Sequence, residues 1–152
     1  MELIELGWTS HFAEAFAQHV GAGLAPGRVS AGFNHLHRVL TREGELLAEV
    51  AGRFRHEARG PEDYPAVGDW VALAPRPEEG RGTIHAVLPR KSAFVRKAAG
   101  AAVEAQVLAA NVDTVFLVAG LDGDFNPRRI ERALVLAWES GAAPAVLLNK
   151  AD

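Results

Sequence analysis

The stretch Val112-Asp-Thr-Val-Phe-Leu-Val-Ala119 decides the fold of the second half of the chain. It is a nearly continuous apolar run rich in β-branched residues, which is typical of a strand buried on both faces of a parallel sheet. A helix is expected next, because Asn126 suits an N-cap, Pro127 suits the first helical position and Gly141 suits a helix end. Ala145-Val-Leu-Leu148 then supplies a second strand. The pattern predicts a βαβ unit with two parallel strands.

The four residues after the second strand are Asn149-Lys150-Ala151-Asp152. Ligands of open α/β sheets bind just beyond the carboxyl ends of the strands. These side chains suit guanine: Asp152 can accept from the ring N–H and the exocyclic amine, and Asn149 can donate to the keto oxygen or N7. The stem of Lys150 can lie along the base. The alternative is a chance match at the polar end of a strand.

A nucleotide site also needs groups that bind phosphate, commonly the loop GxxxxGK[ST] at a helix N-terminus. The lysines of the sequence are Lys91, Lys97 and Lys150, and they follow Arg, Arg and Asn, so the sequence contains no such loop. Either the guanine match is accidental, or the domain is circularly permuted and the chain stops before its phosphate loop.

Residues 28–97 alternate short strands with turns, which is the pattern of a small barrel. Val29–Thr41 changes its alternation near Asn34, which predicts one long strand that bends. Further strands are expected at Leu46–Phe54, Val67–Ala74, Thr83–Leu88 and Ser92–Lys97. Five strands favour an OB-fold over an SH3-like barrel, which is kept as the alternative. Phe54 and Trp70 are expected in its core, and a role as stacking platforms for bases is the alternative.

Basic residues collect in the same segment, which carries twelve bases against nine acids, although the whole chain has a net charge of -3. OB-folds bind ligands across strands two and three, beside the loop between strands four and five. Pro89-Arg90-Lys91 is expected to be that loop. We therefore expect RNA phosphates to contact a basic set, namely Arg53, Arg55, Arg59, Arg90, Lys91, Arg96 and Lys97. A mixed, solvated surface is the alternative.

Three other segments complete the prediction. Residues 8–20 read as a short amphipathic helix, with Ser10 as its cap, that docks over an open end of the barrel. Residues 59–65 are rich in Gly and Pro and predict a mobile loop. The alanine-rich residues 98–106 predict a connector.

The composition is that of a globular protein, with 49% hydrophobic residues and no cysteine. The absence of cysteine excludes disulfides and Cys-based zinc sites, and no metal site is expected in this chain. No signal peptide or membrane span is apparent, so a soluble cytoplasmic protein without a membrane partner is expected.

Several motifs together give the sequence a family resemblance. They are Gly52-Arg-Phe-Arg-His-Glu57, Val67-Gly-Asp-Trp-Val71, Ile84-His-Ala-Val-Leu-Pro-Arg90, Ala109-Ala-Asn-Val-Asp-Thr-Val115, Gly123-Asp-Phe-Asn126 and Asn149-Lys-Ala-Asp152. The sequence resembles the ribosome small-subunit-dependent GTPases, the RsgA or YjeQ family. The resemblance implies an N-terminal OB-fold, a circularly permuted GTPase domain that begins with the guanine motif, and a C-terminal zinc module. It also implies GTP with Mg²⁺, and the small ribosomal subunit and its RNA as partners.

These observations predict a division into four parts. Residues 1–27 form a helical extension, 28–97 an RNA-binding OB-fold and 98–111 a connector. Residues 112–152 open a truncated GTPase domain of the α/β P-loop type, ending at Asn149, Lys150 and Asp152. The function expected of the parent protein is GTP hydrolysis in late maturation of the small ribosomal subunit. The chain alone is expected to be inactive, because groups that touch the γ-phosphate would lie downstream.

Two alternatives remain. One is a non-catalytic RNA-binding barrel with an incomplete α/β appendage. The other is a flavodoxin-like domain in which the guanine match is accidental, but the acidic or glycine-rich residues that such a fold needs at its ligand site are missing.

Overall fold

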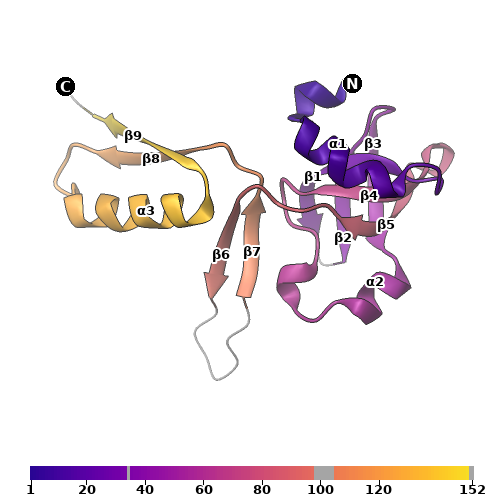
Figure 1. Ribbon diagram of the computed structural model, residues 1–152. Helices are drawn as coiled ribbons and strands as arrows, with labels where there is room; N and C mark the ends of the chain where they lie inside the picture. Colours follow the sequence, from indigo (N-terminus) through magenta and orange to yellow (C-terminus); the bar gives the residue numbers. More distant parts are fainter. Residues whose placement is uncertain (34, 98–104, 151–152) are drawn as a thin grey trace.

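The computed structural model describes residues 1–33, 35–97 and 105–150. The described strands form a closed five-stranded barrel and two separate two-stranded sheets. In Figure 1 the barrel lies on the right, an α/β unit lies on the left, and an antiparallel strand pair lies between them.

The barrel has the connectivity of an OB-fold. Its strands pair in the order β1-β2-β3-β5-β4, with β4 closing on β1. β3 and β5 are parallel and the other pairs are antiparallel. The strands are β1 (Ala25–Phe33), β2 (Leu36–Leu40), β3 (Glu45–Val50), β4 (Trp70–Arg76) and β5 (Arg81–Val87). The OB-fold prediction is confirmed.

Alternating apolar residues from all five strands fill the barrel, as expected for strands with one buried face. The buried set is Val29, Val39, Leu46, Ala48, Val50, Val71, Leu73 and Ile84. One end is covered by α2 (Gly52–Glu57) and the 3₁₀ turn η3 (Pro61–Asp63), from which Phe54 and Tyr64 pack against this core. Another 3₁₀ turn, η4 (Pro77–Glu79), joins β4 to β5.

The N-terminal segment covers a different surface of the barrel. It contains η1 (Leu3–Leu6), α1 (Ser10–Phe16) and η2 (Ala17–His19). Phe12 and Phe16 are buried in one cluster with Trp70 of the barrel, and Trp8 packs edge-on to Trp70 with ring centroids 4.7 Å apart. A docking helix is present, but it packs on the outer face of β4 at Trp70 and Ala72 and not over an open end of the barrel. Its N-cap residue is Thr9, where Ser10 was predicted.

Three strand assignments made from the sequence are wrong. Val29–Thr41 is not one bent strand, because β1 and β2 pair with each other as an antiparallel hairpin, with Phe33 opposite Leu36. Leu46–Phe54 ends as a strand at Val50, and α2 follows. Ser92–Lys97 is not a barrel strand, because β6 (Ala93–Lys97) pairs only with β7 (Ala105–Ala110) among the described residues. Phe54 consequently reaches the core from a helix.

The predicted connector therefore contains a strand at residues 105–110, while residues 98–104 lie outside the described residues. The proposed boundaries between domains stay predictions.

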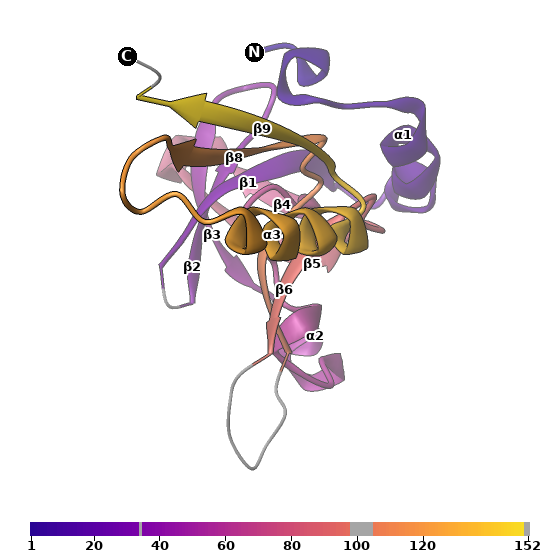
Figure 2. The ribbon, with the colours of Figure 1, turned by 90° about the vertical axis from the view of Figure 1, so that its left-hand side faces the viewer.

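The predicted βαβ unit is confirmed. It consists of β8 (Thr114–Gly120), α3 (Pro127–Ser140) and β9 (Ala143–Asn149), and the two strands are parallel. The Asn126 side chain accepts from the backbone N–H of Arg129, and Gly141 ends the helix with a φ of 88°. Figure 2 shows α3 along one face of the strand pair.

Burial of β8 on both faces was expected and is not observed. Phe116 is 64% exposed and Val118 is 66% exposed. Among the described residues β8 pairs only with β9, and α3 covers a single face, so the side chains of the other face meet solvent.

The aromatic cluster under α1 generates a first prediction. Phe12 is 1% exposed, so replacing it with Ala should lower the free energy of unfolding by about 3 to 5 kcal/mol. Val20, which is 71% exposed, gives the matched control, and Val20→Ala should change stability by less than about 0.5 kcal/mol. Urea unfolding measures both. Equal effects for the two variants would show that α1 is not packed on the barrel.

Candidate nucleotide and RNA sites

The carboxyl ends of β8 and β9 lie side by side. Gly120 is the register partner of Asn149, and the backbone N–H of Leu121 donates to the Asn149 carbonyl at 2.8 Å. This places the start of the predicted guanine motif at the strand edge where α/β sheets bind ligands. Lys150 follows β9 in the left-handed region, with a φ of 57°. Asp152 lies outside the described residues.

Lys150 is held by a carboxylate from the neighbouring loop. Its Nζ lies 2.5 Å from Oδ2 of Asp122, two residues beyond the end of β8. The Asp122 carboxylate also accepts from the backbone N–H of Asp124 at 3.1 Å. The bond from Lys150, followed by that backbone bond, holds the pKa of the Asp122 carboxyl below its usual value. The pair is exposed to solvent, so it orders the lysine more than it stabilises the fold.

The loop between β8 and α3 is ordered by a second ion pair. Arg129 Nη2 lies 3.0 Å from both the carbonyl oxygen and the carboxylate of Asp124. A depression of about 470 Å³ opens beside this loop, between β8 and the first turns of α3. The sequence predicted no role for the Asp122 or Asp124 side chains, because a polar loop after a strand carries acids for many reasons.

Three of the predicted RNA contacts are on or just after α2. Arg53 is fully solvated and pairs with Glu57 one turn later at 2.7 Å. Arg55 lies 3.8 Å from Glu49 of β3. Arg59 follows the helix, and its side chain is exposed. The helix therefore gathers these arginines at one end of the barrel, where the sequence had predicted the end of a strand.

Arg90 has a structural role that the sequence did not reveal. Its guanidinium binds the fully buried carboxylate of Asp69 in bidentate fashion, at 2.8 Å from Nε and 2.7 Å from Nη2. The same group donates to the carbonyl oxygens of Glu62 and Tyr64 at 2.8 and 3.0 Å. These bonds tie the Glu62 and Tyr64 carbonyls to the buried ion pair, and the mobility of the loop at residues 59–65 stays a prediction.

The remaining predicted contacts are dispersed. Lys91 Nζ lies 3.5 Å from the Asp113 carboxylate and 5.8 Å from the Phe12 ring centroid. Arg96 is exposed on β6, and Lys97 ends the same strand. The prediction that Pro89-Arg90-Lys91 is the loop between barrel strands four and five is also wrong, because residues 77–80 join β4 to β5. That loop carries the acidic residues Glu78 and Glu79. Pro89-Arg90-Lys91 instead leaves the barrel toward β6.

Four histidines lie in the barrel segment, residues 28–97. His37 is buried in the barrel and burial lowers its pKa. The others, His35, His56 and His85, are exposed. No three His, Asp or Glu side chains converge as metal ligands in the described part of the chain. Its helices include none that is long and apolar enough to cross a membrane.

Comparison with known proteins places the chain in a family. The model of the family described as RsgA GTPase matches residues 87–152. The Small ribosomal subunit biogenesis GTPase RsgA of Opitutus terrae is 50% identical over the whole chain, which covers 44% of that protein. The chain belongs to the RsgA GTPase family. The RsgA of Syntrophotalea carbinolica is 44% identical, again over the whole chain and over 43% of its own length. The chain therefore spans less than half the length of these RsgA proteins.

Solved structures share the fold. YjeQ from Thermotoga maritima is 28% identical with a TM-score of 0.66, and the match covers 85% of this chain and 42% of that one. YloQ, described as a circularly permuted GTPase, is 19% identical with a TM-score of 0.62 and covers 82% of this chain and 40% of its own. In this RsgA-family chain, the OB barrel followed by a βαβ unit is thus the arrangement found in its relatives.

The buried ion pair generates the second prediction. Arg90→Ala leaves the Asp69 carboxylate without its charged partner in the interior, so the free energy of unfolding should fall by about 3 to 5 kcal/mol. Lys91→Ala, the adjacent control, removes an exposed pair and should cost less than about 1 kcal/mol. Chemical denaturation compares the variants. If Arg90→Ala were as stable as Lys91→Ala, the assignment of Arg90 to a structural role would be incorrect.

Proposed function

We propose that this chain supplies the RNA-binding barrel and the guanine-recognition end of a GTPase that acts in late maturation of the small ribosomal subunit in the cytoplasm. The observation that carries the proposal is the position of Asn149 and Lys150 at the carboxyl edge of a parallel βαβ unit joined to an OB barrel. The names of the RsgA relatives support it, because they describe GTPases of small-subunit biogenesis.

Guanine recognition is proposed for Asn149, Lys150 and Asp152. Asp152 would accept the two donors that guanine presents, and Asn149 would donate to its acceptors. Lys150, whose ammonium group is held by Asp122, would offer its methylene stem to the face of the base. Phosphate and Mg²⁺ would be bound by segments that this sequence does not contain, because it has no GxxxxGK[ST].

RNA binding is proposed for the exposed arginines near α2 together with Lys91 and β6. Each exposed arginine or lysine side chain can neutralise one phosphate and release its counterions. Arg90 contributes less to this proposal, since its guanidinium already has four protein contacts. A non-catalytic RNA-binding module is the second candidate, which the missing phosphate loop favours for the chain by itself.

The third prediction tests guanine recognition. Residues 1–152 should show no measurable GTP hydrolysis and at most very weak guanine binding, because most of the affinity comes from the phosphate loop and Mg²⁺. A longer polypeptide that includes a phosphate loop should bind GTP tightly and reject ATP, which lacks the donors that Asp152 needs. Calorimetry with GTP, ATP and XTP provides the measurement.

Asp152→Asn is the decisive variant in that experiment. XTP carries a keto group where GTP has its amine, so the substitution should shift preference from GTP toward XTP. Glu131→Gln, at an exposed position of α3, is a control for the loss of one charge and should leave base preference unchanged. Unaltered selectivity in Asp152→Asn would reduce Asn149-Lys150-Ala151-Asp152 to the polar end of a strand.

The fourth prediction concerns RNA. Small-subunit binding should weaken with salt, and replacing Arg53 and Arg55 together by Ala should reduce the slope of log affinity against log salt by about 0.7 to 0.9 per lost phosphate contact. The double variant Arg128→Ala with Arg132→Ala removes two exposed arginines of α3 and is the matched control. A slope that changes equally in both variants, or in neither, would refute an RNA surface at α2.

A further inference from the structure

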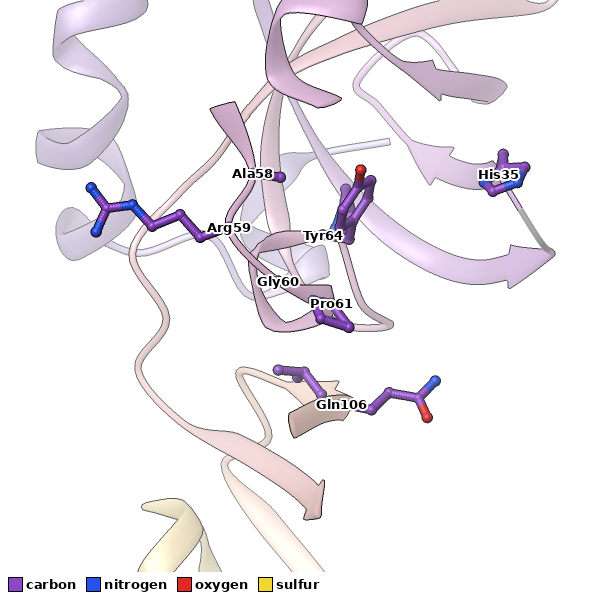
Figure 3. A pocket seen from close by; sticks show the side chains of 9 residues that line it. His35, Ala58, Arg59, Gly60, Pro61, Tyr64 and Gln106 are labelled. Carbon is purple, nitrogen blue, oxygen red and sulfur yellow. The ribbon is translucent and has the colours of Figure 1, made fainter. Parts of the chain in front are cut away.

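A second depression lies between the segment that follows α2 and the strand β7. It has a volume of about 480 Å³ and lies outside the nucleotide site at β8 and β9. Figure 3 shows Tyr64 at its centre, Pro61 and Gln106 on the side of β7, and His35 on the side of the β1–β2 hairpin. Ligand sites in proteins commonly have this size and combine an apolar floor with a few polar groups.

The floor of the depression is apolar and preformed. It includes Pro61, the ring of Tyr64 and the buried Val107. The Tyr64 ring packs edge-on to the Phe54 ring, with ring centroids 5.9 Å apart and an interplanar angle of 72°. The backbone carbonyl oxygen of Tyr64 accepts a hydrogen bond from Arg90 at 3.0 Å. The ring therefore has a fixed orientation, while its side chain is only half-buried. A fixed aromatic ring beside a proline is a surface on which a planar ring can stack.

The rim of the depression offers hydrogen-bonding groups without strong charge. His35 and Gln106 are exposed lining residues, and each can both donate and accept. Arg59 also lines it, but its guanidinium extends away from Tyr64 in Figure 3. Arg96 is the register partner of Gln106, so the two side chains lie on one face of the β6–β7 pair. The cations thus stand outside the apolar floor.

This arrangement favours a base within RNA over a free nucleotide. A free nucleotide brings two or more phosphate charges, and Arg59 is the one cation among the described lining residues. The Asp63 carboxylate, which accepts from the Arg59 backbone at 2.8 Å, would repel additional phosphate. In RNA each nucleotide carries one phosphate charge, which a single arginine can neutralise.

We propose that this depression binds one unpaired RNA base, stacked on Tyr64 and hydrogen-bonded by Gln106 and His35, with Arg59 and Arg96 on the flanking phosphates. Sequence-specific and shape-specific contacts to RNA commonly use bases that leave the stack and lie against aromatic side chains. The inference rests on the RNA binding proposed above and adds to it a site that selects unpaired nucleotides.

The test uses two short RNA duplexes that differ by a single bulged 2-aminopurine. The protein should bind the bulged duplex about 5- to 150-fold more tightly, the range that base–aromatic stacking supplies. The 2-aminopurine fluorescence should be quenched on binding. Tyr64→Leu should lose both effects and retain the affinity for the plain duplex, while Tyr64→Phe should keep them.

A second variant is needed because Tyr64 also packs against the barrel core, so Tyr64→Leu can also lose binding by misfolding. Gln106→Trp changes an exposed strand residue and should fill the depression, so it should abolish the bulge preference without touching the core. Equal affinity for the two duplexes without quenching would overturn this site and leave the RNA surface intact. Quenching that persists in both Tyr64→Leu and Gln106→Trp would also overturn it. Loss of binding to small subunits and to both duplexes would instead refute RNA binding itself.

Discussion

The side chain and backbone of Asn111 join the barrel to the strands that follow it. Asn111 is 5% exposed, and its Oδ1 accepts from the backbone N–H of Lys91 at 2.8 Å. Its Nδ2 donates to the Gly68 carbonyl at 3.1 Å, and its own carbonyl accepts from Arg28 at 3.2 Å. Each of these groups would be unsatisfied in the interior without its partner, which makes the joint costly to open.

The conformation of the joint depends on two residues that tolerate a positive φ. Asn111 has a φ of 55°, which asparagine adopts more readily than other residues with a side chain. Gly68 has a φ of 92°, and a Cβ there would collide with the carbonyl oxygen of Ala110. The backbone at position 68 therefore lies so close to β7 that only glycine fits there. The Ser92 hydroxyl continues the contact by donating to the Val112 carbonyl at 2.9 Å.

This joint lies between the end of β7 at Ala110 and the start of β8 at Thr114. In the chain, Asn111 lies between α2, which carries the proposed RNA contacts, and Asn149, which carries a proposed guanine contact. Arg28 extends the same network to the N-terminal segment, because its guanidinium also donates to the carbonyl oxygens of Leu6 and Gly68.

The sequence predicted those elements whose signals are local. The N-cap Asn126 and the C-terminal Gly141 define α3 from neighbouring residues, and the structure uses both. The pairing partner of a strand cannot be predicted in this way. The alternation of residues 92–97 indicates which face of the strand is buried but not which strand it pairs with. A change of phase near residue 34 in the sequence likewise fits either a bend or a reversal, and the β1–β2 hairpin shows that it is a reversal. Arg90 and Asp69 are 21 residues apart, and nothing local marks them as partners.

The joint at Asn111 can be tested directly by a distance measurement. The chain has no cysteine, so spin labels can be placed at Glu43→Cys on the barrel and Arg132→Cys on α3, both exposed positions. Electron–electron double resonance should give one narrow distance distribution for the labelled protein. Asn111→Gly keeps the positive φ accessible and removes the side-chain bonds, so it should broaden that distribution. A distribution that is already broad with Asn111 present, or that stays narrow in Asn111→Gly, would contradict a joint held by this residue.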